Sequence, residues 1–295
     1  MAKYLKLFNN HEDYLNFKKT DDFILPNVSH CVQENEVHYN PIPDPYNGHA
    51  YIDLGLTSGT KWAKMNVGAS SEKEAGLYFA WGETTGYTAS QVGTDDGKKA
   101  FSPSDYKWAE DGGSTITKYN ASDKKTHLEL TDDAAHVNWG GDWHMPTKEQ
   151  YIELLKETKN GLAIDEGAFI EYAWSDRDGY STETETTATI SGWNTPGFLF
   201  FKRDVSNINA AITNGDYLFI PAAGNCGGGE VGDGGGFVWA SALGSEYVEG
   251  AWSFGFNSYT VVYVVAKAKA GVSSGGRCYG FSVRGVVGQM DEITV

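Results

Sequence analysis

The chain has 295 residues, of which 40% are hydrophobic and 14% aromatic, so it is long enough to build one large core or two smaller ones. Its 39 acidic and 23 basic residues give a formal charge of −16, which excludes nucleic acids and anionic membranes as partners because the chain repels polyanions. The longest apolar run, YTVVYVVA at 259–266, is far shorter than the roughly 20 residues of a membrane-spanning helix.

Residues 1–45 are predicted to form a small separate unit. Asn10 can cap a short helix through Tyr14, Leu15 and Phe17, and the runs 28–32 and 36–39 predict a hairpin. Three prolines within residues 41–45 then exclude regular structure, so we expect a linker there. Polar residues arrive before any apolar segment could form, so no secretory signal is expected.

Residues 46–290 are predicted to form one α+β domain that is poor in helix. Short β-prone runs occupy 51–56, 61–67, 78–81, 198–201 and 217–221, between clusters of Gly, Ser, Asn and Asp. The clearest helix follows Thr147, which forms a capping box with Gln150 and precedes an apolar stripe at Tyr151, Ile152, Leu154 and Leu155. We expect Gly161 to end this helix.

The composition changes at residue 224, since eight of the thirteen residues 224–236 are glycine. Further along, residues 251–259 alternate between aromatic and small side chains. This alternation predicts a strand that buries Trp252, Phe254 and Phe256 and turns Ser253 and Gly255 outward.

Catalytic and metal-binding motifs are weak in this chain. Residues 227–232 match GxGxxG, but no helix pattern follows that could present its N-terminus to a pyrophosphate. Residues 271–275 match GxSxG, but no histidine follows the serine, so we interpret this run as a loop. The pairs 95–96 and 132–133 of aspartates are interpreted as solvated turns, since the alternating ligands of a calcium loop are missing.

The seven histidines and three cysteines show no metal-binding spacing, and Cys31, Cys226 and Cys278 form no CxxC. No catalytic residue, metal or cofactor is therefore expected. A pair of carboxylates for glycoside hydrolysis stays open, because such partners meet in space and not in sequence.

Seven segments carry a family resemblance. They are YIDLGLTSGTKWA at 51–63, NVGA at 66–69, YFAWGE at 78–83, WGGDWHMPT at 139–147, LFIPAAG at 218–224, WAS at 239–241 and FSVR at 281–284. Together they resemble FISUMP-type C-type lectin-like domains, which are relatives of the formylglycine-generating enzyme fold. The resemblance covers nearly everything after Tyr46, although Gly285 stands where the family usually has a proline.

Within that group the chain is similar to the variable proteins of diversity-generating retroelements, which display a mutagenised C-terminal region, here residues 224–287. The segments at 3–9, 26–29 and 35–39 are similar to N-terminal pieces of phage structural proteins. The diversified codon of such proteins is typically AAC, whose adenines are randomised, and this excludes Trp, Glu and Lys as products. The positions compatible with it, expected to form one solvent-facing ligand-binding surface, are Asn225, Val238, Gly244, Tyr247, Val248, Ser253, Gly255, Tyr259, Tyr263, Val264, Tyr279 and Phe281.

The resemblance implies a non-enzymatic receptor-binding protein of a phage tail fibre. Its partners would be a bacterial surface protein or glycan and, through residues 1–45, other virion proteins, and it would assemble as a homotrimer. The paired cysteines of formylglycine-generating enzymes make Cys226 and Cys278 candidates for catalysis, but we interpret them as incidental. The alternatives are an enzyme on that fold, a glycan-binding lectin-like domain, or a structural virion domain without diversification.

Overall fold

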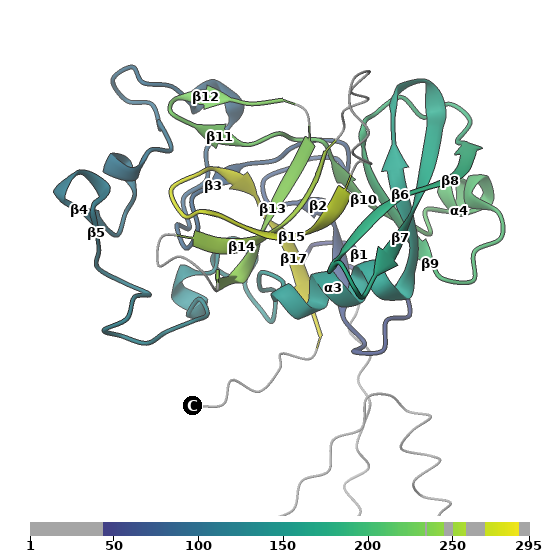
Figure 1. The fold of residues 1–295 in the computed structure, drawn as a ribbon, viewed down its shortest axis with the longest axis horizontal. Helices are drawn as coiled ribbons and strands as arrows, with labels where there is room; N and C mark the ends of the chain where they lie inside the picture. Colours follow the sequence, from purple (N-terminus) through teal and green to yellow (C-terminus); the bar gives the residue numbers. More distant parts are fainter. Residues whose placement is uncertain (1–43, 234, 245–249, 258–268, 289–295) are drawn as a thin grey trace, which may run out of the picture.

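The computed structural model describes residues 44–233, 235–244, 250–257 and 269–288. The helix and hairpin predicted within residues 1–43 lie outside this range. Strands dominate the described part, with short helices between them (Figure 1). The sheet-rich α+β class predicted from the sequence is therefore confirmed.

A ten-stranded sheet forms the body of the protein (Figure 1). Its ten strands form nine neighbouring pairs. All of these pairs are antiparallel except that of β13 with β16, which is parallel. In spatial order the strands are β10 (Leu218–Pro221), β9 (Gly197–Lys202), β6 (Thr158–Ala163), β7 (Ala168–Ser175), β8 (Tyr180–Thr189), β15 (Lys269–Gly276), β14 (Gly250–Asn257), β13 (Gly235–Leu243), β16 (Phe281–Ser282) and β3 (Tyr78–Phe79).

A second sheet brings together the two ends of the described chain. The strands β1 (Tyr51–Ile52) and β17 (Arg284–Val287) pair with opposite edges of β2 (Lys61–Asn66). Two hairpins complete the β-structure, one from β4 (Ala109–Glu110) and β5 (Thr115–Ile116), the other from β11 (Cys226–Gly227) and β12 (Glu230–Val231).

Three α-helices lie within the described residues, α2 (Ala134–Trp139), α3 (Lys148–Glu157) and α4 (Ile208–Asn214). The predicted capping box of α3 is confirmed, since Thr147 accepts from the Gln150 backbone and Gln150 accepts from the Thr147 backbone. The predicted end at Gly161 is wrong, because the chain turns extended at Thr158. Gly161 instead lies inside β6, where an added Cβ would stand 2.2 Å from the Ile170 carbonyl oxygen.

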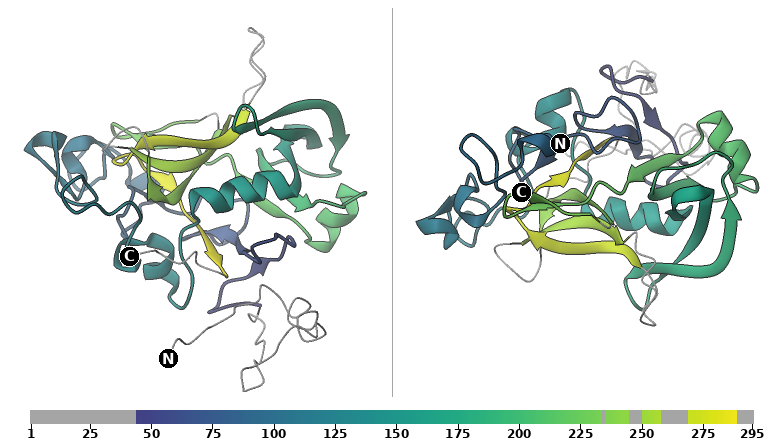
Figure 2. Two further views of the ribbon diagram at one scale, coloured as in Figure 1. Left: turned by 60° about the horizontal axis from the view of Figure 1, so that its bottom comes forward. Right: turned by 90° about the horizontal axis from the view of Figure 1, so that it is seen from above.

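Helix α3 covers one face of β14 and β15 (Figure 2). Its Tyr151 ring stacks on Phe254 at 5.4 Å, and Leu154 and Leu155 join the same buried cluster. The amphipathic stripe read from the sequence is thus the contact that seals this face of the sheet. None of the helices in the described residues has the length and apolar character that crossing a bilayer requires.

The buried Arg284 connects the two sheets. Its guanidinium donates to the carbonyl oxygens of Ala63 at 3.0 Å and Phe219 at 2.9 Å, and burial lowers its pKa to about 10. The next residue, Gly285, has no room for a side chain, because an added Cβ would stand 2.5 Å from the Trp139 ring. A proline there would meet the same ring.

Residues 84–133 form a loop-rich lobe on one side of the sheet, which carries the β4–β5 hairpin (Figure 1). Short 3₁₀ turns occur in this lobe and beyond it, at Ala89–Gln91, Pro103–Asp105, Asp111–Gly113, Leu130–Asp132 and Asp165–Gly167.

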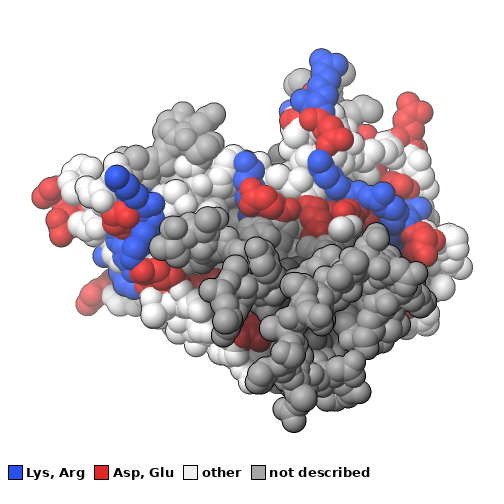
Figure 3. Space-filling model, turned by 90° about the horizontal axis from the view of Figure 1, so that it is seen from below, with Lys and Arg blue, Asp and Glu red and all other residues white. Residues whose placement is uncertain are grey.

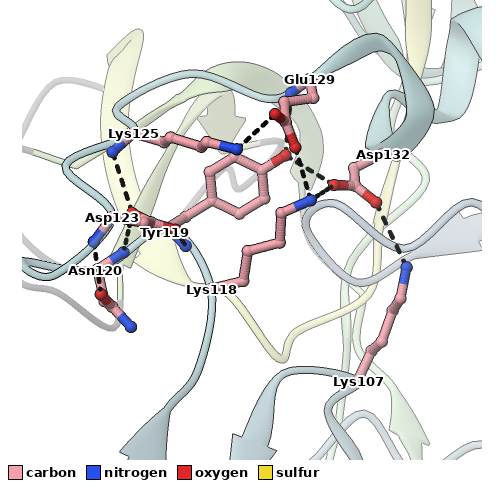
Figure 4. A network of polar contacts seen from close by, with 8 residues as sticks. All are labelled: Lys107, Lys118, Tyr119, Asn120, Asp123, Lys125, Glu129 and Asp132. Carbon is pink, nitrogen blue, oxygen red and sulfur yellow. Dashed lines mark hydrogen bonds and ion pairs between the residues drawn. The ribbon is translucent and has the colours of Figure 1, made fainter.

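Asp132 lies at the centre of a polar network that connects segments of the lobe with one another (Figure 4). Its carboxylate accepts from Lys118 and from the Tyr119 hydroxyl at 2.7 Å, and Lys107 lies 3.4 Å away. The prediction of a solvated turn at 132–133 is wrong, because Asp132 is 5% exposed and Asp133 is 3% exposed. Asp133 instead caps α2 and accepts the Met145 backbone N–H at 2.7 Å.

Candidate ligand-binding site

Four neighbouring strands place one residue each in a row across the sheet. Phe237 on β13 pairs with Gly255 on β14, Gly255 pairs with Gly271 on β15, and Gly271 pairs with Tyr180 on β8. Paired residues point to the same face, so two aromatic side chains flank two glycines. The opposite face of these strands carries Phe254 and belongs to the core beneath α3.

This row lines a hollow of about 430 Å³, which we call the trough. The trough is lined by Phe237, Gly255, Phe256, Gly271, Val272, Ser273, Tyr180, Gly179, Asp178 and Lys269. The volume falls within the range of small-molecule sites, which span roughly 300 to 1,000 Å³. The four strands that form it are neighbours in the sheet, and in this row Gly255 and Gly271 are each paired on both sides.

The two glycines are required by the aromatic side chains beside them. A Cβ on Gly255 would stand 3.1 Å from the Phe237 ring, and a Cβ on Gly271 would stand 2.9 Å from the Tyr180 Cβ. The Phe237 ring therefore leans over Gly255 and lies close to the sheet, whereas at Gly271 the close atoms are the Cβ and Cα of Tyr180.

The rim of the trough is polar and carries both charges. The Lys269 ammonium lies over the Tyr180 ring at 4.2 Å, a cation–π contact, and no carboxylate of the described residues lies within ion-pair distance of it. Asp178 accepts from the Ser175 hydroxyl at 2.8 Å and has Arg177 at 3.8 Å. Exposed Ser273 adds a hydroxyl.

On the same face, two residues further along the strands, the surface is closed. Trp239 is fully buried, donates to the Phe79 carbonyl at 2.7 Å and stacks on Phe281 at 4.1 Å. Phe281 also packs against Phe237, with ring centroids 5.2 Å apart. We call Phe237, Gly255, Gly271 and Tyr180 the open half of this face, and the part beneath Trp239 and Phe281 the covered half.

Three of the positions expected on a solvent-facing surface are buried, and that expectation is wrong for them. Val238 is 1% exposed because it points to the α3 side of the sheet, and Phe281 is 4% exposed because it covers Trp239. Ser253 is 1% exposed in the covered half, where its hydroxyl donates to the Ser273 carbonyl at 3.2 Å.

The other expected positions fall into two groups. Gly255 lies in the trough, Tyr279 is 43% exposed and stacks along Phe281, and Asn225 and Gly244 are half-buried. The remaining five lie outside the described residues, and they are Tyr247, Val248, Tyr259, Tyr263 and Val264. Of the predicted inward aromatics, Phe254 and Phe256 are buried, whereas Trp252 is half-buried under Lys148.

Sequence reasoning missed most of the residues that line the trough. Tyr180 and Asp178 come from a hairpin some seventy to ninety positions before the strands they join, and no local pattern links them to those strands. Lys269 was set aside because a randomised AAC codon does not encode lysine. Phe237 had a usable signal, since it precedes Val238 in a strand whose alternate residues face opposite sides.

The motifs weighed for catalysis take ordinary structural roles. The GxGxxG run forms the β11–β12 hairpin, and the GxSxG run forms strand β15 and not the loop that we expected. Cys226 is a free cysteine, and burial raises the pKa of its thiol to about 12. A thiol with that pKa is protonated at neutral pH and is a poor nucleophile.

A second hollow, of about 340 Å³, lies beside β2 and the end of α2. His49 stacks on Trp139 at one wall, with ring centroids 4.2 Å apart, and Asn66 and Asn138 also line it. Six of its twelve lining residues, among them Asn66 and Trp139, belong to the segments that carry the family resemblance. Trp139 is half-buried here, whereas Trp62, Trp81 and Trp143 are fully buried.

Charges of both signs are mixed on the face seen from below, where Lys and Arg side chains stand beside Asp and Glu side chains (Figure 3). Within the described residues no group of three or more His, Cys, Asp or Glu side chains is arranged to hold a metal ion. Comparisons of the chain with protein-family models, curated proteins and solved structures find no match.

Proposed function

We propose that this protein is a non-enzymatic binding protein that contacts a molecule of a bacterial surface through the trough. The observation that carries the proposal is that the two faces of β13, β14 and β15 have different surroundings. One face of these strands is packed beneath α3, while the open half of the other face presents Phe237 and Tyr180 at a hollow. Tyr180 lies outside the packed clusters and can change without disturbing them, whereas Phe237 also packs on Phe281.

The chemistry of the trough suits recognition. Tyrosine and phenylalanine supply contact area at a small cost in conformational entropy, and glycine and serine allow close approach. The polar groups are few and stand at the rim, as in most ligand sites. The thiols offer little for catalysis, since Cys226 is buried and protonated.

The lectin-like scaffold belongs to the same proposal. Contacts between the resembling segments support it, because each segment packs on another. Trp81 donates to the Ala240 carbonyl at 2.9 Å, the Val67 N–H donates to the Val283 carbonyl at 2.9 Å, and the Ser241 N–H donates to the Pro146 carbonyl at 2.8 Å. Segments that pack mutually are expected to be retained together by a shared fold.

We extend the proposal to a diversified tail-fibre protein that assembles as a homotrimer and attaches to the virion through residues 1–45. A trimer would multiply weak contacts into avidity. Sequencing the neighbourhood of the gene tests diversification directly. A nearby copy of the 3′ end that differs at adenines supports it, and a locus without such a copy contradicts it.

Adhesion to bacteria tests the binding function. The labelled protein is incubated with a panel of bacterial species, and bound protein is measured by flow cytometry. We expect adhesion to at least one species, and we expect Phe237→Ala together with Tyr180→Ala to abolish it. The matched control is Leu130→Ala with Val137→Ala, which removes exposed apolar side chains outside the trough and should leave adhesion unchanged.

Equal adhesion by the trough variant and the wild type, with both folded, would show that the trough is not the contact surface. The effect of replacing Tyr247, Tyr259 and Tyr263 by Ala is a second prediction about adhesion. We expect it to abolish adhesion while the melting curve hardly moves.

A further inference from the structure

We propose that the trough binds an uncharged saccharide ring, an inference that rests on the binding function proposed above. The shape of the trough, the charge of its rim and the pairing of its strands point to this ligand class independently of one another.

The shape favours a single ring. Three strand spacings of about 4.8 Å separate Phe237 from Tyr180, so their backbones lie roughly 14 Å apart. The Phe237 ring leans inward over Gly255, which narrows the open space further. A saccharide ring presents a face of C–H bonds, and those carry a partial positive charge that suits the negative face of an aromatic ring.

The rim favours a ligand that both donates and accepts hydrogen bonds. Lys269 donates, Asp178 accepts, and the Ser273 and Tyr180 hydroxyls do either, so the hydroxyl groups of a sugar find partners around the trough. Among the residues that line the trough, Lys269 and Asp178 carry opposite charges, and Arg177, which stands 3.8 Å from Asp178, lies outside the lining. A lining without net charge, on a chain of formal charge −16, favours a neutral saccharide over an acidic one.

The fold disfavours the common modes of peptide binding. Strand addition needs an exposed sheet edge, and in the row that forms the trough Gly255 and Gly271 are each paired on both sides. A bound helix is about 10 Å wide with its side chains, which is too wide for a trough that the Phe237 ring narrows from roughly 14 Å. A flat protein interface would bury about 800 Å² on each partner, far more than this hollow presents.

The experiment uses the full chain and three sets of probes at 150 mM NaCl. Isothermal titration measures binding to neutral hexose and N-acetylhexosamine oligosaccharides, to oligogalacturonates of the same length, and to acetylated peptide amides that contain Phe or Glu. We expect a neutral oligosaccharide to bind and to lose about tenfold in affinity with Tyr180→Ala or Phe237→Ala. Lys269→Gln should weaken it several-fold through one lost hydrogen bond, and Val137→Ala should have no effect.

A second arm uses the cells to which the protein adheres. Mild periodate cleaves the vicinal diols of glycans, whereas proteinase K removes surface proteins. Adhesion that is lost after periodate and survives proteinase K supports the saccharide. Adhesion that survives periodate and is lost after proteinase K overturns it, as does equal or tighter binding of oligogalacturonates or peptides.

These outcomes separate the two proposals. Trough-dependent adhesion to cells that resists periodate refutes the saccharide and leaves the binding function standing. Adhesion that is unchanged by Phe237→Ala and Tyr180→Ala refutes the trough as the contact surface, and it refutes the saccharide inference as well.

Discussion

The open and covered halves of one sheet face differ although the same strands build both. In the open half Phe237 and Tyr180 flank two glycines at a hollow, whereas two residues along, Trp239 is fully buried under Phe281. The difference arises because β16 and the loop-rich lobe close over one half and stop short of the other. His127 of the lobe bridges Ala242 of β13, and the Leu128 N–H donates to the Ser241 carbonyl at 2.9 Å.

Alternation of side chains along a strand predicts which face of the sheet each residue points to, but it does not predict whether that face is exposed to solvent. Exposure on this sheet depends on what distant segments place over the face. Substitutions in the two halves are therefore expected to have opposite consequences: the covered half should govern stability, and the open half should govern binding.

The largest expected effect is that of Trp239→Ala in the covered half. The change removes a fully buried ring stacked on Phe281 and deletes its hydrogen bond to Phe79. We expect a loss of about 3 to 5 kcal/mol in the free energy of unfolding, measured by urea denaturation. A loss below about 1 kcal/mol would mean that this half is not packed as described.

The next effect concerns the lobe that covers this half. Burial alone would raise the pKa of Asp132, but hydrogen bonds from Lys118 and Tyr119 outweigh it and hold the pKa below the usual value. The carboxylate therefore stabilises the fold above the ordinary carboxyl pKa of about 3.9, and this stabilisation is lost as the pH falls through the folded-state pKa.

We expect Asp132→Asn to cost about 2 kcal/mol at pH 7, because two charge-assisted hydrogen bonds weaken. Unfolding curves between pH 7 and pH 3 should show the variant and the wild type converging as the pH falls. A constant difference across this range would assign the stabilisation to another group.

The two cysteines provide a smaller contrast. Cys226 is fully buried with a raised thiol pKa of about 12, whereas Cys278 is half-buried. We expect iodoacetamide at pH 8 to leave Cys226 unmodified in the folded protein, with peptide mass spectrometry as the measurement. Replacing Cys226 by Ala should cost about 1 to 2 kcal/mol. Fast alkylation of Cys226 under native conditions would contradict the burial.

The smallest expected effect on stability comes from Tyr180→Ala in the open half. The side chain is half-buried, and its contacts are mainly Gly271 and Lys269. We expect the free energy of unfolding to change by about 0.5 kcal/mol or less while adhesion is lost. A cost approaching that of Trp239→Ala would show that the two halves do not differ.

Local sequence signals predicted the elements that local chemistry determines. The capping box at Thr147 and Gln150 and the apolar stripe of α3 are confirmed, because both depend on residues within one or two turns of helix. The strands predicted at 61–67 and 217–221 are confirmed at Lys61–Asn66 and Leu218–Pro221.

The candidate site could be predicted only in part, because long-range pairing creates it. Gly255 was expected to face outward, and it lines the trough. Its partners Gly271 and Tyr180 reach it through register across three strands, which no local pattern encodes. Ser253 satisfies the same alternation as Gly255 and is nevertheless buried, because the lobe and β16 close over its half of the face.

The attachment of β1 has a mechanical consequence. Only two register pairs join β1 to β2 among the described residues, whereas β17 on the other edge carries the Arg284 anchor. A pull through the N-terminal end would reach Tyr46, which is tied to Asp142 and Trp143, and then load the short β1 ladder in shear. Under such tension β1 should separate from β2 first, and this separation should leave β2, β17 and the trough intact.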